Sequence, residues 1–339
     1  MLTSDFDYSL PPGCIAQTPL EPRHNSRLMV LQRDTGTLKD DHFYNIGAYL
    51  NSGDLLVINQ SKVIPARLRA RKPSGGKVEL LLLKQQYPGV WQALVGGKGL
   101  RAGTHVQVEN GPEVEIIEEL EGSERLLRFL GPIEESLNQI GEMPLPPYIH
   151  EKLQDPQRYQ TVYAAVNGSA AAPTAGLHFT ETLISELAAA GVRFARVTLH
   201  VGLDTFAPVT EANASEHKIH TEWCELTAET AAQINLTRQA GGKVVAVGTT
   251  SVRVLESAAA LSGLPGRVAP FRGATGLFIL PGYHFQVVDA MITNFHLPKS
   301  TLLMLVSAFA GKERVFNAYQ QAIERGYRFY SFGDAMLIQ

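Results

Sequence analysis

The hydrophobic pattern of the chain changes twice, and this change constrains the fold more than any other feature. Between about Ile64 and Leu130, short alternating runs such as 66–72 (ARLRARK) and 77–84 (KVELLLLK) are separated by glycine turns, a spacing typical of a small barrel or sandwich. On both sides of this segment, strand-like runs alternate with helical patterns, which indicates an α/β domain. The β-rich segment is therefore predicted to be an insertion into a larger α/β domain.

Both flanking segments carry local signals for buried strands and capped helices. The apolar runs 27–31 (RLMVL) and 54–59 (DLLVIN) are suited to a buried sheet. Thr180 and Thr227 are typical helix N-caps, and glycines end the helical runs that follow them. We expect the α/β domain to be built from both ends of the chain, with the insertion ending at a stiff linker, 143–147 (MPLPP).

Composition excludes several classes of protein. The 339 residues are 45% hydrophobic and 19% charged, the balance of a folded chain rather than a disordered one. No apolar run approaches the roughly 20 residues of a membrane span, and the first residues lack the pattern of a signal peptide. The cysteines, Cys14 and Cys224, lie far apart, so we expect neither a disulfide framework nor a cysteine zinc site. These features favour a cytoplasmic protein without membrane contact.

The charge distribution leaves contact with nucleic acid open. A net charge of −3 and a pI near 6.4 argue against it, because phosphate contacts need lysine and arginine. An average over the whole chain can hide a local patch, however. The densest basic cluster comprises Lys62, Arg67, Arg69, Arg71, Lys72 and Lys77. An RNA contact and a solvated strand face are both compatible with this cluster.

Five short segments combine polar side chains with glycines at the expected ends of strands or starts of helices. Such positions in α/β folds commonly hold ligands and anions, and His200 with Asp204 can form an acid/base pair. Tight packing, a salt-bridged turn and ordinary helix capping are the structural alternatives. The segments are 169–180 (SAAAPTAGLHFT), 200–206 (HVGLDTF), 247–256 (VGTTSVRVLE), 293–300 (TNFHLPKS) and 331–336 (SFGDAM).

Familiar catalytic motifs do not occur in the sequence. There is no Gly-x-Ser-x-Gly of a hydrolase and no Gly-x-Gly-x-x-Gly of a dinucleotide fold. His217 and His220 have helical spacing with Glu222 nearby, but the pattern of a histidine–glutamate zinc helix is missing. We therefore expect no metal ion, and we interpret the two histidines as a polar surface or a substrate-facing pair.

Several longer strings, in the same order along the chain, resemble the S-adenosylmethionine:tRNA ribosyltransferase–isomerase (QueA) family. The resemblance covers essentially the whole chain, with mild departures from the usual family residue at Ser61, Asp204, Ile219 and Phe332. The matching strings are 5–8 (DFDY), 15–19 (IAQTP), 26–31 (SRLMVL), 62–68 (KVIPARL), 75–79 (GGKVE), 171–180, 198–206, 248–253, 293–305 and 327–336.

The resemblance implies both a fold and a reaction. The fold is a discontinuous α/β catalytic domain, residues 1–62 and 148–339, with an inserted small antiparallel β-barrel domain, residues 63–147. In the reaction, the ribosyl moiety of S-adenosylmethionine is transferred to 7-aminomethyl-7-deazaguanine at the tRNA wobble position. The sugar is isomerised to give epoxyqueuosine, and adenine and methionine leave. S-adenosylmethionine is then a co-substrate, no prosthetic group is needed, and the partner of a monomeric enzyme is tRNA.

The resemblance and this chemistry together suggest roles for individual residues. A sulfonium acidifies the protons on the 5′-carbon, and a histidine is suited to remove one of them. The catalytic candidates are His178, His296 and His200, with Asp334 to orient a histidine or to accept a proton from the attacking amine. Residues expected to hold S-adenosylmethionine are Thr174, Gly176, Gly248, Thr249, Thr250, Ser251, Arg253 and Asn294. The expected RNA contacts are Lys62, Arg67, Arg69, Arg71 and Arg23.

Two other functions remain compatible with the sequence. An α/β enzyme acting on a small nucleoside or glycosyl substrate without RNA fits the acidic pI. A non-catalytic RNA-binding module fits the inserted β-rich segment, but the chain has no run of aromatic residues for base stacking. Salt-sensitive RNA affinity separates the first of these from a tRNA-modifying enzyme.

Overall fold

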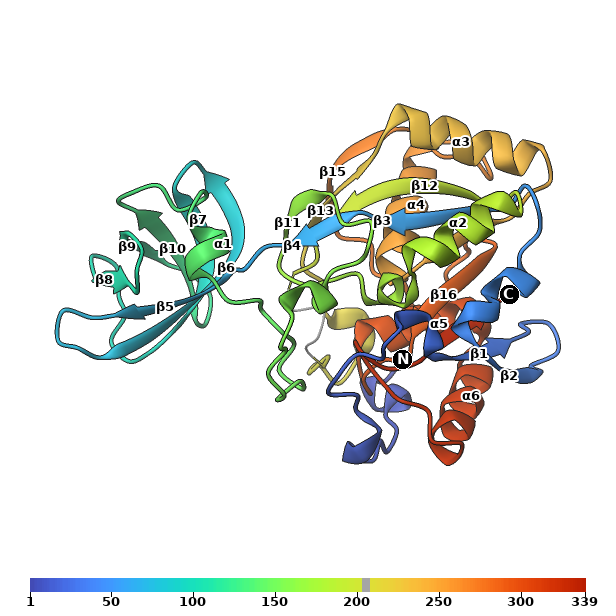
Figure 1. Cartoon of the computed structure of the whole chain (residues 1–339), viewed down its shortest axis with the longest axis horizontal. Coiled ribbons are helices and arrows are strands. Elements are labelled where there is room, and N and C mark those ends of the chain that lie inside the picture. The colour runs from blue at the N-terminus through green and yellow to red at the C-terminus, as the bar shows by residue number, and fades with distance from the viewer. Residues whose placement is uncertain (203–207) are drawn as a thin grey trace. The chain divides into compact units, whose positions relative to one another are not determined.

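The computed structural model describes residues 1–202 and 208–339, so Asp204 lies outside the described residues. The chain forms two compact units. One comprises residues 1–61, 147–166 and 173–339, and the other comprises residues 62–146 and 167–172. Figure 1 shows the first unit as a sheet with helices and the second as a small barrel of strands.

The first unit is built on a nine-stranded sheet with the order β15-β13-β12-β3-β14-β16-β17-β1-β2. The central strands β12, β3, β14 and β16 run parallel to one another. Strands β3, β14 and β16 are apolar and buried along most of their length, as expected of parallel strands covered on both faces. The bounds are β1 Arg27–Leu31, β2 Leu38–His42, β3 Leu55–Asn59, β12 Arg193–Leu199, β13 Glu222–Leu226, β14 Val244–Val247, β15 Phe271–Thr275, β16 Ala290–Asn294 and β17 Ala335–Ile338.

The helices of this unit begin where the sequence carries capping residues. The hydroxyl oxygens of Thr180, Thr227 and Ser300 accept hydrogen bonds from backbone N–H groups in the first turns of α2, α3 and α5, which satisfies donors left free at a helix start. The α-helices are α2 Glu181–Ala189, α3 Ala228–Gln239, α4 Thr249–Ser262, α5 Thr301–Ala310 and α6 Lys312–Glu324. The short 3-10 helices are η1 Thr3–Phe6, η2 Pro12–Cys14, η3 Arg23–Asn25, η4 Phe43–Tyr49, η5 Pro156–Tyr159, η6 Thr174–His178 and η8 Ala214–Glu216.

The second unit contains a closed barrel with the strand order β10-β7-β6-β5-β8-β9. All of its strand pairs are antiparallel, and burial alternates along strands such as β7, as the pleat requires. The predicted fold class, a discontinuous α/β domain with an inserted small antiparallel barrel, is confirmed. The bounds are β5 Arg67–Arg71, β6 Lys77–Tyr87, β7 Val90–Gly96, β8 His105–Val108, β9 Glu113–Glu119 and β10 Glu124–Phe129, with α1 at Leu137–Ile140. A separate two-stranded sheet is formed by β4 Ser61–Val63 and β11 Val166–Ser169.

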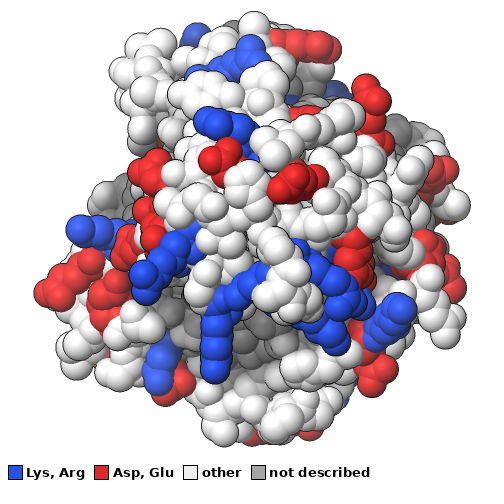
Figure 2. All heavy atoms as spheres, turned by 90° about the vertical axis from the view of Figure 1, so that its left-hand side faces the viewer, with Lys and Arg blue, Asp and Glu red and all other residues white. Residues whose placement is uncertain are grey.

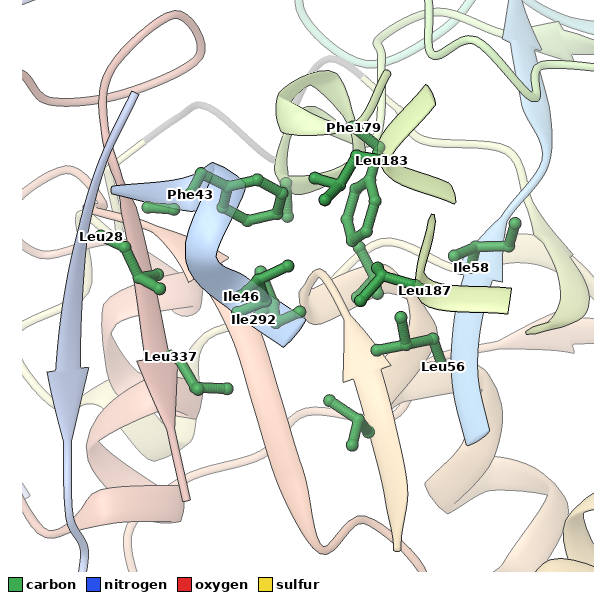
Figure 3. Close-up of a cluster of buried hydrophobic side chains, with 14 of the residues drawn as sticks. Leu28, Phe43, Ile46, Leu56, Ile58, Phe179, Leu183, Leu187, Ile292 and Leu337 are labelled. Carbon is green, nitrogen blue, oxygen red and sulfur yellow. The ribbon is translucent and has the colours of Figure 1, made fainter. Parts of the chain in front are cut away.

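A continuous apolar core joins the large sheet to η4, η6 and α2. Figure 3 shows Phe43 and Ile46 of η4, together with Leu183 and Leu187 of α2, gathered over the strands. Because η6 leads directly into Phe179 and α2, this packing also fixes the position of His178 at the end of η6. Among the described residues, no helix is long and apolar enough to cross a membrane.

Replacing Leu56 by alanine tests the importance of this core. Leu56 is fully buried, so Leu56→Ala removes buried methyl groups and leaves a cavity, and we expect the free energy of unfolding to fall by about 2–5 kcal/mol. Leu236→Ala is the matched control because Leu236 is 60% exposed, and its effect should stay within about 0.5 kcal/mol. Urea unfolding measures both, and equal losses in the two variants would contradict the assignment of the core.

Candidate active site

The polar segments that the sequence singles out follow or precede strands at one edge of the large sheet. The parallel strands β12, β14 and β16 all end at this edge. His200 follows β12, Gly248 follows β14, and Asn294 is the last residue of β16. Strand β17 is antiparallel to β16 and β1 is parallel to β17, so Asp334 and Ser26, which precede these two strands, lie at the same edge. Ligands of α/β folds commonly bind at such an edge.

The edge is too long for all of these residues to meet at one point. Neighbouring strands lie about 4.8 Å apart. Four strand steps separate β12 from β17, which places His200 roughly 19 Å from Asp334 along the edge. The site therefore consists of a histidine group around β16 and β1, the start of α4 near the middle, and a second polar group around β12.

His178 is buried, and both of its ring nitrogens have partners. Nδ1 lies 2.7 Å from the hydroxyl oxygen of Ser26, and Nε2 lies 3.2 Å from the side-chain nitrogen of Asn294. The side-chain oxygen of Asn294 accepts a hydrogen bond from the Thr174 hydroxyl at 3.2 Å. Three predicted residues, His178, Asn294 and Thr174, thus form one network with Ser26. Ser26 carried no signal in the sequence beyond its place in a matching string.

His296 is held mainly through its backbone. Its N–H donates to the Tyr319 hydroxyl at 2.9 Å, and its carbonyl accepts a hydrogen bond from the Tyr8 hydroxyl. Its ring nitrogen Nε2 lies 2.7 Å from the hydroxyl oxygen of Thr293. Sequence reasoning missed both tyrosines, because Tyr8 and Tyr319 are remote from His296 in the chain.

Burial determines the charge of these histidines. It lowers the pKa of His178 to about 3, assisted by the positive charge of Arg328, and it lowers the pKa of His296 to about 3 as well. The physical cause is the loss of hydration, which disfavours the imidazolium form. Both rings are therefore neutral at ordinary pH, so each can accept a proton or hydrogen bond without first being deprotonated.

Asp334 joins two segments of backbone. One carboxylate oxygen accepts from the N–H of Arg27 at 2.9 Å and the other from the N–H of Arg328 at 2.8 Å. Burial raises the pKa of this carboxyl, although the two backbone donors oppose the effect. These contacts tie the start of β1 to the turn before β17, and none of the described hydrogen bonds of Asp334 reaches a histidine.

The start of α4 lies close to η6. Gly248 has a φ of 87°, and a Cβ at this position would lie 3.5 Å from both Ala175 and the Thr250 hydroxyl. The Thr250 hydroxyl is buried and, within the described part of the chain, has no hydrogen-bond partner. A helix N-terminus also presents free N–H groups and a positive dipole end. These donors are suited to a carboxylate or another oxygen-rich group.

A pocket that is open to solvent adjoins His178. Arg23, Ser26, Arg158, Ser331 and Phe332 are among the residues that line it. Burial lowers the pKa of both arginines. The guanidinium of Arg158 pairs with Glu21 and donates to the carbonyl of Leu20. The guanidinium of Arg23 donates to the carbonyls of Gln157 and Gln160.

Comparison with known proteins identifies the family. The model of the family described as "Queuosine biosynthesis protein" matches residues 3–338. The chain belongs to this family. It is 56% identical over 342 residues to the S-adenosylmethionine:tRNA ribosyltransferase-isomerase of Carboxydothermus hydrogenoformans and 55% identical over 343 residues to that of Caldanaerobacter subterraneus, with both chains covered completely. A crystal structure of S-adenosylmethionine tRNA ribosyltransferase from Thermotoga maritima is 42% identical, with a TM-score of 0.58, and the match covers 99% of this chain and 100% of that one.

In this member of the queuosine biosynthesis family, Arg253 is directed toward another side chain. It forms a buried ion pair with Glu222 and donates to the carbonyls of Leu277 at 3.1 Å and Thr275 at 3.3 Å. Glu222 in turn accepts from the N–H of Gly202 at 2.8 Å. The sequence predicted that Arg253 supports the co-substrate. Its described contacts join α4 to β13 and β15, and through Glu222 to Gly202, which follows β12.

Two other residues predicted to bind the co-substrate are occupied by packing or hydrogen bonds within the protein. A Cβ at Gly176 would collide with the hydroxyl of Tyr163, so glycine is required there for the tyrosine to pack. The Ser251 hydroxyl donates to the carbonyl of Val247 at 2.8 Å, as serines inside helices often do. Thr249 is buried beside them at the start of α4.

His200 lies in the second polar group. Its ring stacks on Trp223 at 5.1 Å, and its Nδ1 lies 3.4 Å from the Ser61 hydroxyl. Burial lowers the pKa of His200. The acid/base pair that the sequence suggested for His200 involves Asp204, which lies outside the described residues.

The predicted RNA contacts of the barrel are already paired with acidic side chains. Arg67, Arg69 and Arg71 form ion pairs with Glu79, Glu142 and Glu109 at 3.5, 2.7 and 2.9 Å, while Lys62 is half-buried. Figure 2 shows basic and acidic side chains intermixed on the face in view. The local charge of the cluster is therefore smaller than the sequence alone suggests.

The pair His217 and His220 shows no metal-binding arrangement. His217 Nδ1 lies 2.9 Å from a carboxylate oxygen of Glu211. Within residues 1–202 and 208–339, no three histidine, cysteine or acidic side chains stand together as a metal site would require.

Acidification should destabilise the protein through its buried histidines. The folded pKa values of His178 and His296 lie near 3, below the unfolded value of about 6.5. The unfolded chain therefore binds more protons between these pH values, and each histidine lowers the free energy of unfolding by about 1.4 kcal/mol per pH unit as the pH falls below 6. Urea unfolding between pH 7.5 and 5 should show a shallower slope for His178→Gln and His296→Gln than for wild type. The exposed control His150→Gln should keep the wild-type slope, and four parallel curves would contradict this prediction.

Neutralising Glu222 should lower the free energy of unfolding far more than neutralising a glutamate whose ion pair with arginine is exposed. Both members of the Glu222–Arg253 pair are 8% exposed, so Glu222→Gln leaves a buried guanidinium without its counter-charge, and we expect a loss of about 3–5 kcal/mol. Glu109→Gln breaks the Arg71 pair, whose side chains are 52% and 39% exposed, and should cost less than about 1 kcal/mol. Equal denaturation midpoints for the two variants would exclude a structural role for the buried pair.

Proposed function

We propose that this chain transfers and isomerises the ribosyl moiety of S-adenosylmethionine onto tRNA in queuosine biosynthesis. The observation that carries the proposal is similarity along the whole chain, at 55% and 56% identity, to proteins named S-adenosylmethionine:tRNA ribosyltransferase-isomerase. The gathering of the matched polar segments at one sheet edge supports it. The chain is accordingly a transferase and isomerase.

We further propose the reaction in detail. The acceptor is 7-aminomethyl-7-deazaguanine at the tRNA wobble position, the product is epoxyqueuosine, and adenine and methionine leave. S-adenosylmethionine is consumed as a co-substrate, without a prosthetic group or metal ion. The enzyme acts as a monomer in the cytoplasm, where its tRNA substrate is found.

The start of α4 is the proposed site for the methionine carboxylate. The free N–H groups of the helix, the Thr249 side chain and the unpaired Thr250 hydroxyl provide donors, and Gly248 adds no side chain beside them. Thr174 and Asn294 border the same region through their mutual hydrogen bond. We assign Gly176, Ser251 and Arg253 to shaping this site from behind, because their own contacts are made within the protein.

His296 is the proposed base that removes a proton from the 5′-carbon. Its Nε2 bonds Thr293, and among the described residues its Nδ1 has no hydrogen-bond partner, whereas both ring nitrogens of His178 are engaged. Burial lowers the pKa of His296, which keeps the ring unprotonated and at the same time makes it a weaker base. The backbone hydrogen bonds of His296 to Tyr8 and Tyr319 hold the ring in place, so little reorganisation is needed before proton transfer. His200 and Asp334 remain proposed acceptors for the proton of the attacking amine.

The inserted domain, residues 63–147, is the proposed contact for the tRNA backbone, and residues 1–62 with 148–339 form the catalytic domain. Arg67, Arg69 and Arg71 can bind phosphate by exchanging their exposed glutamate partners for it, since exposed pairs contribute little stability. Lys62, which directly precedes this domain, is a further proposed phosphate contact. Arg23 lines the pocket beside His178 and is the proposed contact nearest the reacting nucleotide.

Labelled S-adenosylmethionine tests the proposed function. With tRNA carrying 7-aminomethyl-7-deazaguanine, label in the ribose should enter the RNA, and label in the methyl group should not. The affinity for this tRNA should fall steeply between 50 and 200 mM salt, because phosphate contacts release counterions. Label in RNA from the methyl group would contradict ribosyl transfer. Turnover of a small nucleoside with salt-independent, weak RNA binding would favour the alternative, an enzyme that acts without RNA.

A further inference from the structure

The amide of Asn294 has only one orientation compatible with its neighbours. Its nitrogen lies 3.0 Å from the carbonyl oxygen of Tyr330 and 3.2 Å from Nε2 of His178. With the amide reversed, its oxygen would face the Tyr330 carbonyl, and two acceptors would repel each other. The Thr174 hydroxyl, which donates to the amide oxygen, is consistent with the same orientation. Asn294 therefore directs one N–H to Tyr330 and the other to His178.

This orientation decides where His178 carries its proton. Nε2 accepts the N–H of Asn294, so in the neutral ring the proton is on Nδ1. Nδ1 lies 2.7 Å from the Ser26 oxygen and donates to it. The Ser26 hydroxyl then cannot point its own proton at His178. Because Ser26 lines the open pocket, its O–H is free to donate to a ligand bound there.

The pocket thus combines the hydroxyl donor of Ser26 with apolar walls. Arg23 and Arg158 also line it, but their guanidinium groups donate to the carbonyls of Gln157, Gln160 and Leu20, and Arg158 pairs with Glu21. Leu177 and Phe332 supply apolar surface. A flat heterocycle whose ring nitrogens accept hydrogen bonds matches this lining. Adenine has such acceptors, whereas the pairing edge of a guanine-type base presents N–H donors.

We propose that this pocket binds the adenine of S-adenosylmethionine and that Ser26 donates a hydrogen bond to a ring nitrogen of the departing base. His178 and Asn294 are positioning residues that point the Ser26 proton outward. When the bond between the ribose C1′ and adenine N9 breaks, the electron pair remains on adenine, and the Ser26 hydrogen bond stabilises this charge. No proton leaves Ser26, and the released base takes its proton from water. The inference rests on the proposed function for the identity of the leaving base.

The test uses the full-length protein and free adenine as the probe. Calorimetry should show that adenine binds, that guanine binds more weakly, and that Ser26→Ala lowers the adenine affinity about 5- to 20-fold, the effect of losing one directed hydrogen bond. Ser185→Ala, a serine on the exposed face of α2, is the matched control and should bind like wild type. Unchanged affinity in Ser26→Ala, or a preference for guanine, would overturn the proposal.

Asn294→Asp reverses the hydrogen-bond direction without changing the size of the side chain. Aspartate accepts from Nε2–H, so the His178 proton should move from Nδ1 to Nε2, and Ser26 should turn its proton inward. Nitrogen-15 spectra of the histidine rings report this tautomer directly, and adenine affinity should fall as in Ser26→Ala, with no further loss in the double variant. If Asn294→Asp does not fold, the wild-type spectrum suffices, because a proton on Nε2 there would refute the relay.

These binding and spectroscopic measurements require no turnover. A protein that binds adenine through Ser26 but transfers no ribosyl label to tRNA would contradict the proposed function and leave this pocket assignment standing. A protein that transfers the label but binds adenine equally well without the Ser26 hydroxyl would support the proposed function and contradict the pocket assignment.

Discussion

The whole site depends on the parallel pairing of β12, β3, β14 and β16. Parallel strands end at the same edge of a sheet, so segments that are far apart in the chain deliver their polar ends to one line. Strand β17 is antiparallel to β16, and β1 is parallel to β17, so the starts of these two strands bring Asp334 and Ser26 to the same line. If one of these strands were shifted by one residue, every side chain on it would change face, and the network around His178 would be lost.

The chemistry of this edge relies on the direction of hydrogen bonds more than on charge. Burial keeps the pKa of His178 and that of His296 near 3, so neither ring carries a positive charge that would repel a sulfonium substrate. A neutral imidazole has one donor and one acceptor, and its neighbours decide which nitrogen is which. Around His178 the decision is made by Asn294 and Tyr330, whereas His296 is fixed mainly by hydroxyl groups.

Local patterns predicted the elements well, but they could not predict which distant side chains contact one another. Thr180 and Thr227 cap helices as expected, because a cap and the N–H that it satisfies are only three residues apart. The sequence predicted that Arg253, on α4, supports the co-substrate, and in the structure it pairs with Glu222 of β13, 31 residues away. Ser26 carried no signal of its own, since its partner His178 is 152 residues distant.

The sequence by itself determined the alternation of strands and helices, the inserted barrel and, through its resemblance to a family, the reaction class. These follow from periodicity, capping and order along the chain, which are properties of near neighbours. Only the tertiary structure decided which nitrogen of His178 bears the proton, which threonine hydroxyl is left unpaired and which arginine is already neutralised. Each of those depends on contacts within about 3 Å between distant segments, and spacing along the sequence contains no such distances.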